Sequence, residues 1–132
     1  MSDLEQVRGI VRLSSSYSVS ETVERLEAAL KARGLRLFGR IDHATAAVDA
    51  GLKMPPTQVL LFGNPTSGTP LMLAAPTLAI DLPFKALIWE DEAGHTWLAY
   101  NDPEYLQSRH RVPRLLRENF HGLINLLHEI VA

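Results

Sequence analysis

Two strongly amphipathic helix patterns, separated by short alternating segments, constrain most what this chain can fold into. The first pattern starts at Ser18, which forms a capping box with Glu21, and ends at Gly34. The second opens at Pro113 and repeats apolar residues at helical spacing to the end of the chain. Each helix must bury its apolar stripe, and a sheet face offers the surface for it. We therefore expect both helices on one face of a sheet.

Five segments are predicted to be β-strands, some from their alternation and one, residues 57–62, from a continuous apolar run typical of a central strand. They are residues 7–14, 35–41, 57–62, 84–90 and 95–101, and shorter helices are expected at 43–50, from Thr69 through Ala75, and at 103–109. Residues 84–101 read as a hairpin closed at Gly94. This order predicts an α+β fold: a two-layer sandwich whose mainly antiparallel sheet of about five strands carries two main helices on one face.

Composition narrows the setting of the protein. The 132 residues suit a single α+β domain spanning positions 1–132. The absence of cysteine removes disulfides, thiolate nucleophiles and Cys-ligated metals. A net charge of −2 makes nucleic acid an unexpected partner. No basic, apolar leader opens the chain and no apolar run approaches ~20 residues, so we expect a cytoplasmic protein that does not enter membranes.

Several short motifs, taken in order, carry a family resemblance. They are Ser16-Tyr17-Ser18, Ile41-Asp42-His43, Phe62-Gly63-Asn64-Pro65, Gly68-Thr69-Pro70-Leu71-Met72, Asp81-Leu82-Pro83 and Tyr100-Asn101-Asp102-Pro103. With them the chain resembles the bacterial and archaeal family called domain of unknown function 302. The resemblance implies a fold similar to a TBP-like half-domain, with helices on one face of a curved sheet, and a homodimer. It brings no established catalytic residues to transfer.

A polar cluster is the first candidate site. Its members are Asp42, His43, Asn64, Asn101, Asp102 and His110, each at a strand end or in an adjoining loop. A carboxylate that orients an imidazole can make a general base, so His43 or His110 could act with Asp42 or Asp102. His43, His110 and one carboxylate could instead hold a metal ion. The structural alternative is that Asp42 and Asp102 cap helices, Asn64 shapes a turn and the histidines bond to nearby carbonyls.

The second candidate is the turn from Gly63 to Gly68, which leads into a helix expected to begin at Thr69. Backbone amides and the helix dipole at such a turn can hold a phosphate or carboxylate. Gly68 and Thr69 therefore join the candidate ligand-binding residues. The turn lacks the lysine of a P-loop and the spaced glycines of a dinucleotide site, so an ordinary strand-to-helix turn is the alternative.

The third candidate is a basic sheet face. It would form if the first two strands lie side by side, and its residues are Arg8, Ile10, Arg12, Arg36, Phe38 and Arg40. A second subunit could cover this face, because its apolar members would otherwise stay in water. The alternative is a solvated outer face.

Three functions remain open at this point. The first is a homodimeric module that binds a small, possibly anionic ligand or a metal. The second is a hydrolase-like or other acid/base enzyme that uses His43 or His110, although the common serine hydrolase and zinc protease signatures are absent. The third is a purely structural or interaction domain. No cofactor is predicted.

Overall fold

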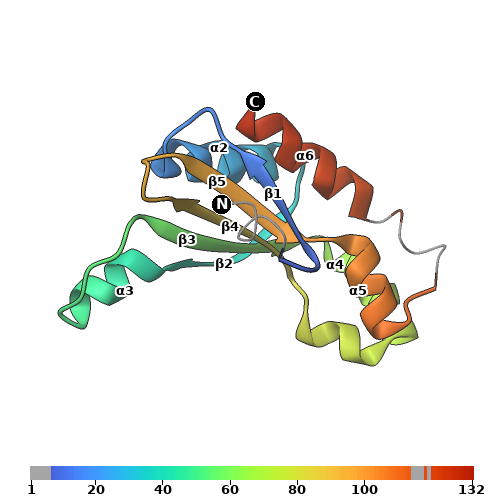
Figure 1. Ribbon diagram of the computed structural model, residues 1–132. Helices are drawn as coiled ribbons and strands as arrows, with labels where there is room; N and C mark the ends of the chain where they lie inside the picture. The colour runs from blue at the N-terminus through green and yellow to red at the C-terminus, as the bar shows by residue number, and fades with distance from the viewer. Residues whose placement is uncertain (1–6, 114–117, 119) are drawn as a thin grey trace.

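The structure, a computed structural model, describes residues 7–113, 118 and 120–132. Within them, one antiparallel sheet is formed by β1 (Ile10–Ser14), β2 (Arg36–Asp42), β3 (Thr57–Gly63), β4 (Phe84–Glu90) and β5 (Thr96–Asn101). The strand order is β1-β5-β4-β3-β2 (Figure 1). The hairpin of β4 and β5 is therefore central, and the chain's first two strands form the edges.

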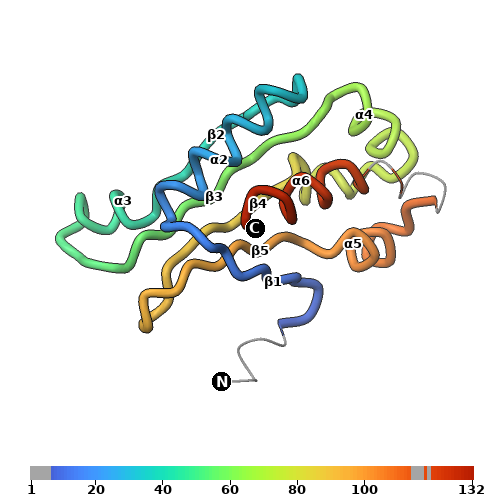
Figure 2. The backbone as a smooth tube through the Cα atoms, turned by 90° about the horizontal axis from the view of Figure 1, so that it is seen from above, coloured from blue at the N-terminus to red at the C-terminus, as the bar shows by residue number. Residues whose placement is uncertain are grey.

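The helices fall into three groups. Two long ones, α2 (Val19–Ala32) and α6 (His121–Val131), lie side by side across one sheet face (Figures 1 and 2). At one end of the sheet lies α3 (His43–Asp49), and at the other lie α4 (Pro65–Ala74), the 3-10 helix η1 (Pro76–Ile80) and α5 (Pro103–His110). The predicted two-layer α+β sandwich is confirmed.

The core lies between the sheet and the helices α2 and α6. The predicted helix stripe of Val19, Val23, Leu26 and Leu30 is buried, as are Leu126, Leu127 and Ile130 of α6. The strands contribute every second residue to it, namely Leu60, Phe62, Phe84, Ala86, Ile88, Leu98 and Tyr100. Burial of each leucine, isoleucine, valine or phenylalanine side chain in this core stabilises the fold by about 1.5–3 kcal/mol before conformational entropy is counted.

The predicted capping box at the start of α2 is also confirmed. The hydroxyl of Ser18 accepts a hydrogen bond from the backbone N–H of Glu21 at 3.1 Å, and the Glu21 carboxylate faces the Ser18 N–H. Behind it, the hydroxyls of Ser15 and Thr22 meet at 2.8 Å inside the core. These contacts fix where the chain leaves β1 and enters the helical layer.

The start of α4 differs from the predicted one, and the predicted start of the last helix lies outside the described residues. Helix α4 begins at Pro65 with Asn64 as its N-cap, five residues before the predicted cap Thr69, so Thr69 and Pro70 lie inside it. An asparagine cap followed by proline is as strong a start signal as Thr69-Pro70, and it comes first along the chain. The predicted opening of the last helix at Pro113 runs through residues 114–117 and 119, which lie outside the described residues.

The basic sheet face required β1 and β2 to lie side by side, and this condition is not met, because the two strands are at opposite edges of the sheet. The alternation within β2 is also interrupted. A bulge between Leu37 and Gly39 shifts the register, so Arg40 pairs with Leu60 on the helix-covered face while Arg36 pairs with Gly63 on the other.

The sheet face opposite the helices is apolar and aromatic at its centre. Trp89 and Trp97 pair with each other across β4 and β5, and the guanidinium of Arg12 stacks 4.1 Å from the Trp97 ring. None of the helices in the described part of the chain is long and apolar enough to cross a membrane.

Candidate functional site

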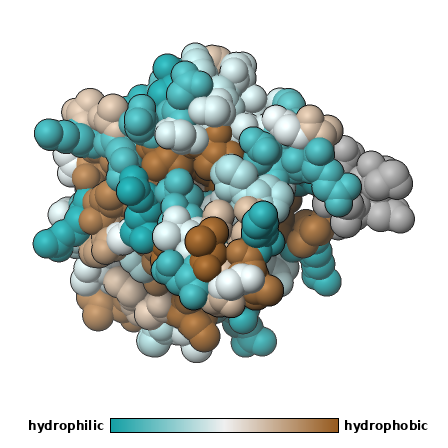
Figure 3. Space-filling view, turned by 90° about the vertical axis from the view of Figure 1, so that its left-hand side faces the viewer, coloured by the Kyte–Doolittle hydropathy of each residue, from teal (hydrophilic) through white to brown (hydrophobic). Residues whose placement is uncertain are grey.

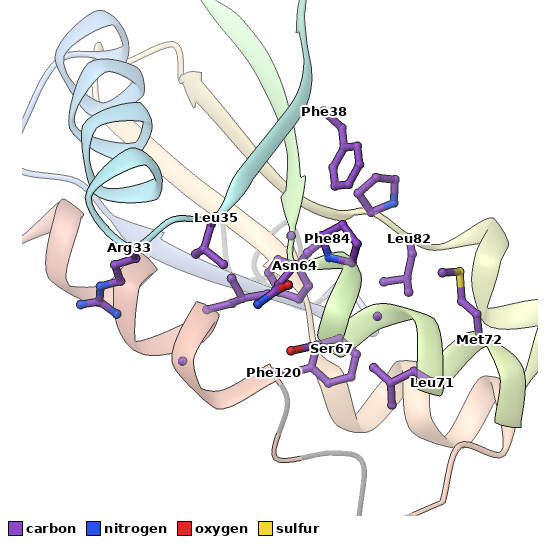
Figure 4. A pocket seen from close by; sticks show the side chains of 16 residues that line it. Arg33, Leu35, Phe38, Asn64, Ser67, Leu71, Met72, Leu82, Phe84 and Phe120 are labelled. Atoms are coloured by element: carbon purple, nitrogen blue, oxygen red, sulfur yellow. The ribbon is translucent and has the colours of Figure 1, made fainter.

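A cavity of about 420 Å³ opens at the end of the sheet where β3 leads into α4 (Figure 4). The end of α2, the start of α6 and the segment before β4 complete its walls. Its surface is mostly apolar, and the side chains that make it so are Leu35, Phe38, Leu71, Met72, Leu82, Phe84, Phe120 and Leu123. The rings of Phe84 and Phe120 pack at a tilt of 37° with centroids 5.9 Å apart, and both side chains are buried.

Few polar side chains border the cavity, and two of them, Asn64 and Arg33, have partners within the chain. The Asn64 carboxamide accepts a hydrogen bond from the Thr66 N–H at 2.9 Å and so caps α4. Arg33 forms an ion pair with Glu129 of α6, and Figure 4 shows its guanidinium pointing away from the apolar side chains. The walls of the cavity are therefore suited mainly to contact with an apolar molecule.

The amides at the start of α4 already have partners within the chain. Pro65 has no N–H, and the N–H groups of Ser67 and Gly68 donate to the Asn64 carbonyl at 3.0 and 2.9 Å. With Thr66 bonded to the Asn64 side chain, the first turn presents no unbonded amide to an anion. The geometry thus favours the ordinary strand-to-helix turn over the candidate anion site. Gly68 does line the cavity, whereas Thr69 is exposed outside it.

A smaller cavity of about 250 Å³ lies on the other side of Phe120 and carries the acidic groups of this region. Asp102, Glu104 and His121 border it together with Tyr100. Burial raises the pKa of the Tyr100 hydroxyl, and the nearby Asp102 carboxylate adds to the shift. The two cavities therefore differ in character, and titratable groups border the smaller one.

The predicted polar cluster does not assemble. Asp42 pairs with Gln58 at one end of β3, whereas Asn64 follows the other end. Seven strand residues separate the two ends by about 20 Å. His43 is accordingly far from Asn101, Asp102 and His110, as the positions of α3 and α5 in Figure 1 show. The hypothesis of a metal site shared by His43 and His110 is therefore wrong. Among the described residues there is also no group of three side chains that could hold a metal ion.

The structural interpretation of the cluster is confirmed for its caps. Asp42 accepts from the Thr45 N–H at 2.9 Å, and Asp102 accepts from the Glu104 N–H at 3.0 Å. The bond from Thr45 to the carboxylate lowers the pKa of Asp42. Asn101 ends β5 opposite Ile10, and His43 is exposed at the start of α3.

His110 has partners that the sequence did not reveal. Its Nε2 lies 2.5 Å from Oδ2 of Asp81, and its Nδ1 lies 2.8 Å from the Thr77 hydroxyl. Arg109 also pairs with Asp81 at 3.0 Å. The order hydroxyl, imidazole, carboxylate is that of a catalytic triad, but neither Thr77 nor His110 lines the 420 Å³ cavity. The sequence had singled out His110 as a candidate, but it singled out Asp81 only as part of the motif Asp81-Leu82-Pro83.

The predicted basic face is divided between the two edges of the sheet, so that expectation is wrong. On the β1 side, Arg12 stacks on Trp97 and Arg8 lies 6.0 Å from the Tyr105 ring, with Ile10 beside them. On the β2 side, each residue makes a different contact. Arg40 pairs with Glu27 at 3.2 Å. Arg36 lies over the ring of Phe38, which itself lines the cavity.

Comparison with known proteins places the chain in a family. The model described as "Domain of unknown function DUF302" matches residues 11–130. The chain belongs to the DUF302 family. Its fold is similar to the crystal structure of an uncharacterized conserved DUF302 protein from Bacillus stearothermophilus, with a TM-score of 0.77 and 21% identity over 95% of this chain and 97% of that one. At this identity the likeness supports the fold alone.

Longer curated proteins contain a segment similar to this DUF302 chain. The chain is 48% identical over 102 residues to the Fluoride-specific ion channel FluC 1 of Brucella suis biovar 1. These residues make up 77% of this chain and 40% of that protein. The FluC 2 protein of Brucella melitensis biotype 1 matches at the same identity, with 38% of its length covered. The DUF302 chain thus spans about two fifths of these relatives, and their name describes the longer proteins.

Proposed function

We propose that this DUF302 chain is a binding module that holds a small, mainly apolar molecule in the cavity between α4, α6 and the end of β3. The observation that carries the proposal is the cavity itself, about 420 Å³ with predominantly apolar walls. Ligand pockets in proteins have about 300–1,000 Å³ and apolar linings with few polar groups. The buried Phe84 and Phe120 rings supply rigid contact area for such a ligand.

The lining of the cavity favours binding over acid–base catalysis. Among the described residues that border it there is no histidine, aspartate or glutamate. General acid–base chemistry needs a titratable group within about 3 Å of the reacting proton. His110, whose side chain is 4% exposed, is held by Asp81 and Thr77 outside this cavity.

A fluorescent apolar probe tests the proposal. N-phenyl-1-naphthylamine is uncharged and gains fluorescence in apolar sites, so titration of the purified protein reports binding directly. Gly68 lines the cavity, and a Cβ built there meets only Leu82 Cδ1, at 3.9 Å. A leucine at this position fills cavity space without a clash of its Cβ.

We expect the Gly68→Leu variant to bind the probe about tenfold more weakly than wild type, a loss of about 1.4 kcal/mol. The matched control is Thr69→Leu, which adds the same side chain one position along α4, where the residue is exposed and outside the cavity. This control should bind within about twofold of wild type. Equal affinities of the two variants, or no fluorescence gain with wild type, would contradict the proposal.

We also propose that the module acts in the cytoplasm as a homodimer. As a second candidate function, we propose that it regulates an ion channel. The chain is 48% identical to part of a protein named a fluoride channel, and this part makes up about two fifths of that protein. The other three fifths could form the channel, which would leave the matched part to regulate it. Fluoride efflux from cells that express the Brucella suis relative with and without the matched 102 residues tests it. Regulation would be contradicted if the relative with the matched segment and the relative without it gave the same fluoride efflux, both in the presence and in the absence of N-phenyl-1-naphthylamine.

A further inference from the structure

A hydroxyl, an imidazole and a carboxylate lie in hydrogen-bonding series outside both cavities. Nδ1 of His110 is 2.8 Å from the Thr77 hydroxyl oxygen, which is within the range for a nucleophile and its general base. Nε2 of the same ring is 2.5 Å from Oδ2 of Asp81. The series matches the nucleophile, base and orienting group of acyl-transfer enzymes.

Two short elements bring the three side chains together. Thr77 is the second residue of η1, and Asp81 directly follows that helix. α5 packs against η1 and ends at His110, so the imidazole bridges the two residues of the η1 segment. The neighbouring Arg109 donates to both oxygens of Asp81, at 3.3 and 3.0 Å. This second contact fixes the orientation of the carboxylate, and the carboxylate in turn fixes the ring.

The hydrogen-bond partners determine which ring nitrogen of neutral His110 carries the proton. A carboxylate only accepts hydrogen bonds, so Nε2 of the ring donates to Asp81. Nδ1 therefore keeps its lone pair and accepts a hydrogen bond from the Thr77 hydroxyl. This is the state in which an imidazole can take the proton of a hydroxyl group.

Burial leaves the hydroxyl end of the series accessible. The His110 side chain is 4% exposed and that of Asp81 is 16% exposed, whereas Thr77 is an exposed residue. The imidazole and the carboxylate are thereby shielded from water that would compete for their hydrogen bonds. A substrate can still reach the Thr77 hydroxyl from solution.

A second hydroxyl–imidazole contact provides a comparison within the same chain. The Ser14 hydroxyl lies 2.7 Å from Nε2 of His95, which follows the β4–β5 turn. Figure 3 faces this end of the molecule, and η1 and α5 lie at the other end (Figure 1). Among the described residues, no carboxylate bonds to the other ring nitrogen of His95. The Ser14 contact thus lacks the orienting group that the Thr77 contact has.

We propose that Thr77 is the nucleophile of an esterase site in which His110 is the general base and Asp81 orients the imidazole. The activity goes beyond the proposed binding function and does not depend on the 420 Å³ cavity. It needs no metal or cofactor, because water is the second substrate.

The reaction proceeds through an acyl-threonine. Oγ of Thr77 attacks the ester carbonyl carbon while its proton moves to Nδ1 of His110, and the carbonyl electron pair moves to oxygen. When the carbonyl re-forms, the bond to the leaving alcohol breaks and the leaving oxygen takes the proton from Nδ1. Water then attacks the acyl group, its proton passing through Nδ1 to Oγ, and a carboxylic acid is released. The sum is one ester and one water to one acid and one alcohol.

The surroundings of Thr77 indicate which esters fit. A 3-10 helix has three residues per turn, so Ile80 lies one turn after Thr77 on the same side of η1. Its side chain is 73% exposed and offers contact to an apolar acyl group. A positioned general base contributes about 10²–10⁴-fold to the rate, so esters with a good leaving group are the class that this site can turn over.

Hydrolysis of p-nitrophenyl butyrate by the full chain tests the site. Thr77→Ala and the matched control Ser14→Ala each remove an exposed hydroxyl that bonds an imidazole. We expect Thr77→Ala to lower kcat/KM at least about tenfold, Ser14→Ala to stay within about twofold, and Thr77→Ser, which keeps Oγ, to stay within about threefold of wild type. Equal activity of the two alanine variants, or no hydrolysis by wild type above the buffer rate, would overturn the proposal.

A covalent intermediate separates a nucleophile from a hydroxyl that only supports the structure. Wild type and Ser14→Ala, mixed with the ester, stopped in acid and digested, should carry one butyryl group on the peptide that contains Thr77. Thr77→Ala should lack it, and circular dichroism checks that this variant is folded. A butyryl group found only on other residues of wild type would overturn the assignment of Thr77, because hydrolysis would then not pass through its hydroxyl.

Discussion

Nε2 of His110 lies 2.5 Å from Oδ2 of Asp81, and this contact joins the end of α5 to the segment between η1 and β4. The His110 side chain is only 4% exposed, and its other ring nitrogen meets the Thr77 hydroxyl. Leu82 and Pro83, which follow Asp81 directly, line the 420 Å³ cavity. A buried polar contact outside the cavity therefore holds one of its apolar walls.

Replacing Asp81 should destabilise the fold. In Asp81→Ala the buried imidazole loses its carboxylate partner, and an unsatisfied buried polar group costs about 1–3 kcal/mol. Arg109→Ala removes the other partner of Asp81 but from a side chain that is 50% exposed, so its cost should stay below about 1 kcal/mol. Urea unfolding measures both. Similar losses in the two variants would contradict the role assigned to the buried contact.

The start of α4 can be tested by comparing its observed and predicted caps. Asn64→Ala removes the acceptor of the Thr66 N–H and should lower the free energy of unfolding by about 1 kcal/mol. Thr69→Ala changes an exposed residue inside the helix and should change it by less than about 0.5 kcal/mol. Thermal unfolding of both variants gives the comparison. The opposite order would place the cap at Thr69, as the sequence alone suggested.

Local patterns predicted the elements well because each depends on neighbours in the sequence. Ser18 and Glu21 are three residues apart, and their capping box needs nothing from the rest of the chain. The hairpin of β4 and β5 follows equally from its short connection, in which Gly94 has a φ of +82°. The α+β sandwich was predictable on the same grounds.

The site was not predictable, because it depends on which strands pair. No local pattern indicated that β1 pairs with β5, and this pairing puts Arg12 and Arg36 on opposite edges. Nor did the alternation of β2 reveal the bulge that takes Phe38 out of the expected series. The cavity combines residues from α2, β2, α4 and α6, which only the tertiary structure brings together.

The contact between Asp91 and Trp97 predicts a measurable shift in a titration. The Trp97 indole N–H donates to Asp91 at 2.9 Å, and this bond, followed by that from the His95 N–H, lowers the pKa of Asp91 from its ordinary 3.8. The bonds favour the ionised carboxylate. Their contribution is therefore present above the ordinary pKa and is lost as the pH falls through the lowered value.

The Trp97 indole resonance in a ¹H–¹⁵N correlation spectrum reports that titration. We expect it to stay constant above about pH 5 and to move with a midpoint below 3.8. The Trp89 indole, which is not among the donors to Asp91, provides the internal control. A Trp97 midpoint at or above the ordinary value would show that the indole does not stabilise the carboxylate in solution.

Gly9 makes the sharpest prediction about the fold itself, because two independent constraints act on it. Its φ is +80°, and a Cβ at this position would lie 2.7 Å from atoms of the Tyr105 ring. Gly94 has nearly the same φ, +82°, with nothing within 4 Å of its Cβ position. Gly94→Ala should therefore cost only the backbone strain, about 1 kcal/mol. Gly9→Ala must also displace Tyr105 or the turn before β1, and we expect a total loss of about 2–4 kcal/mol in urea unfolding. If the two variants were equally stable, the ring of Tyr105 would not pack against Gly9 in solution.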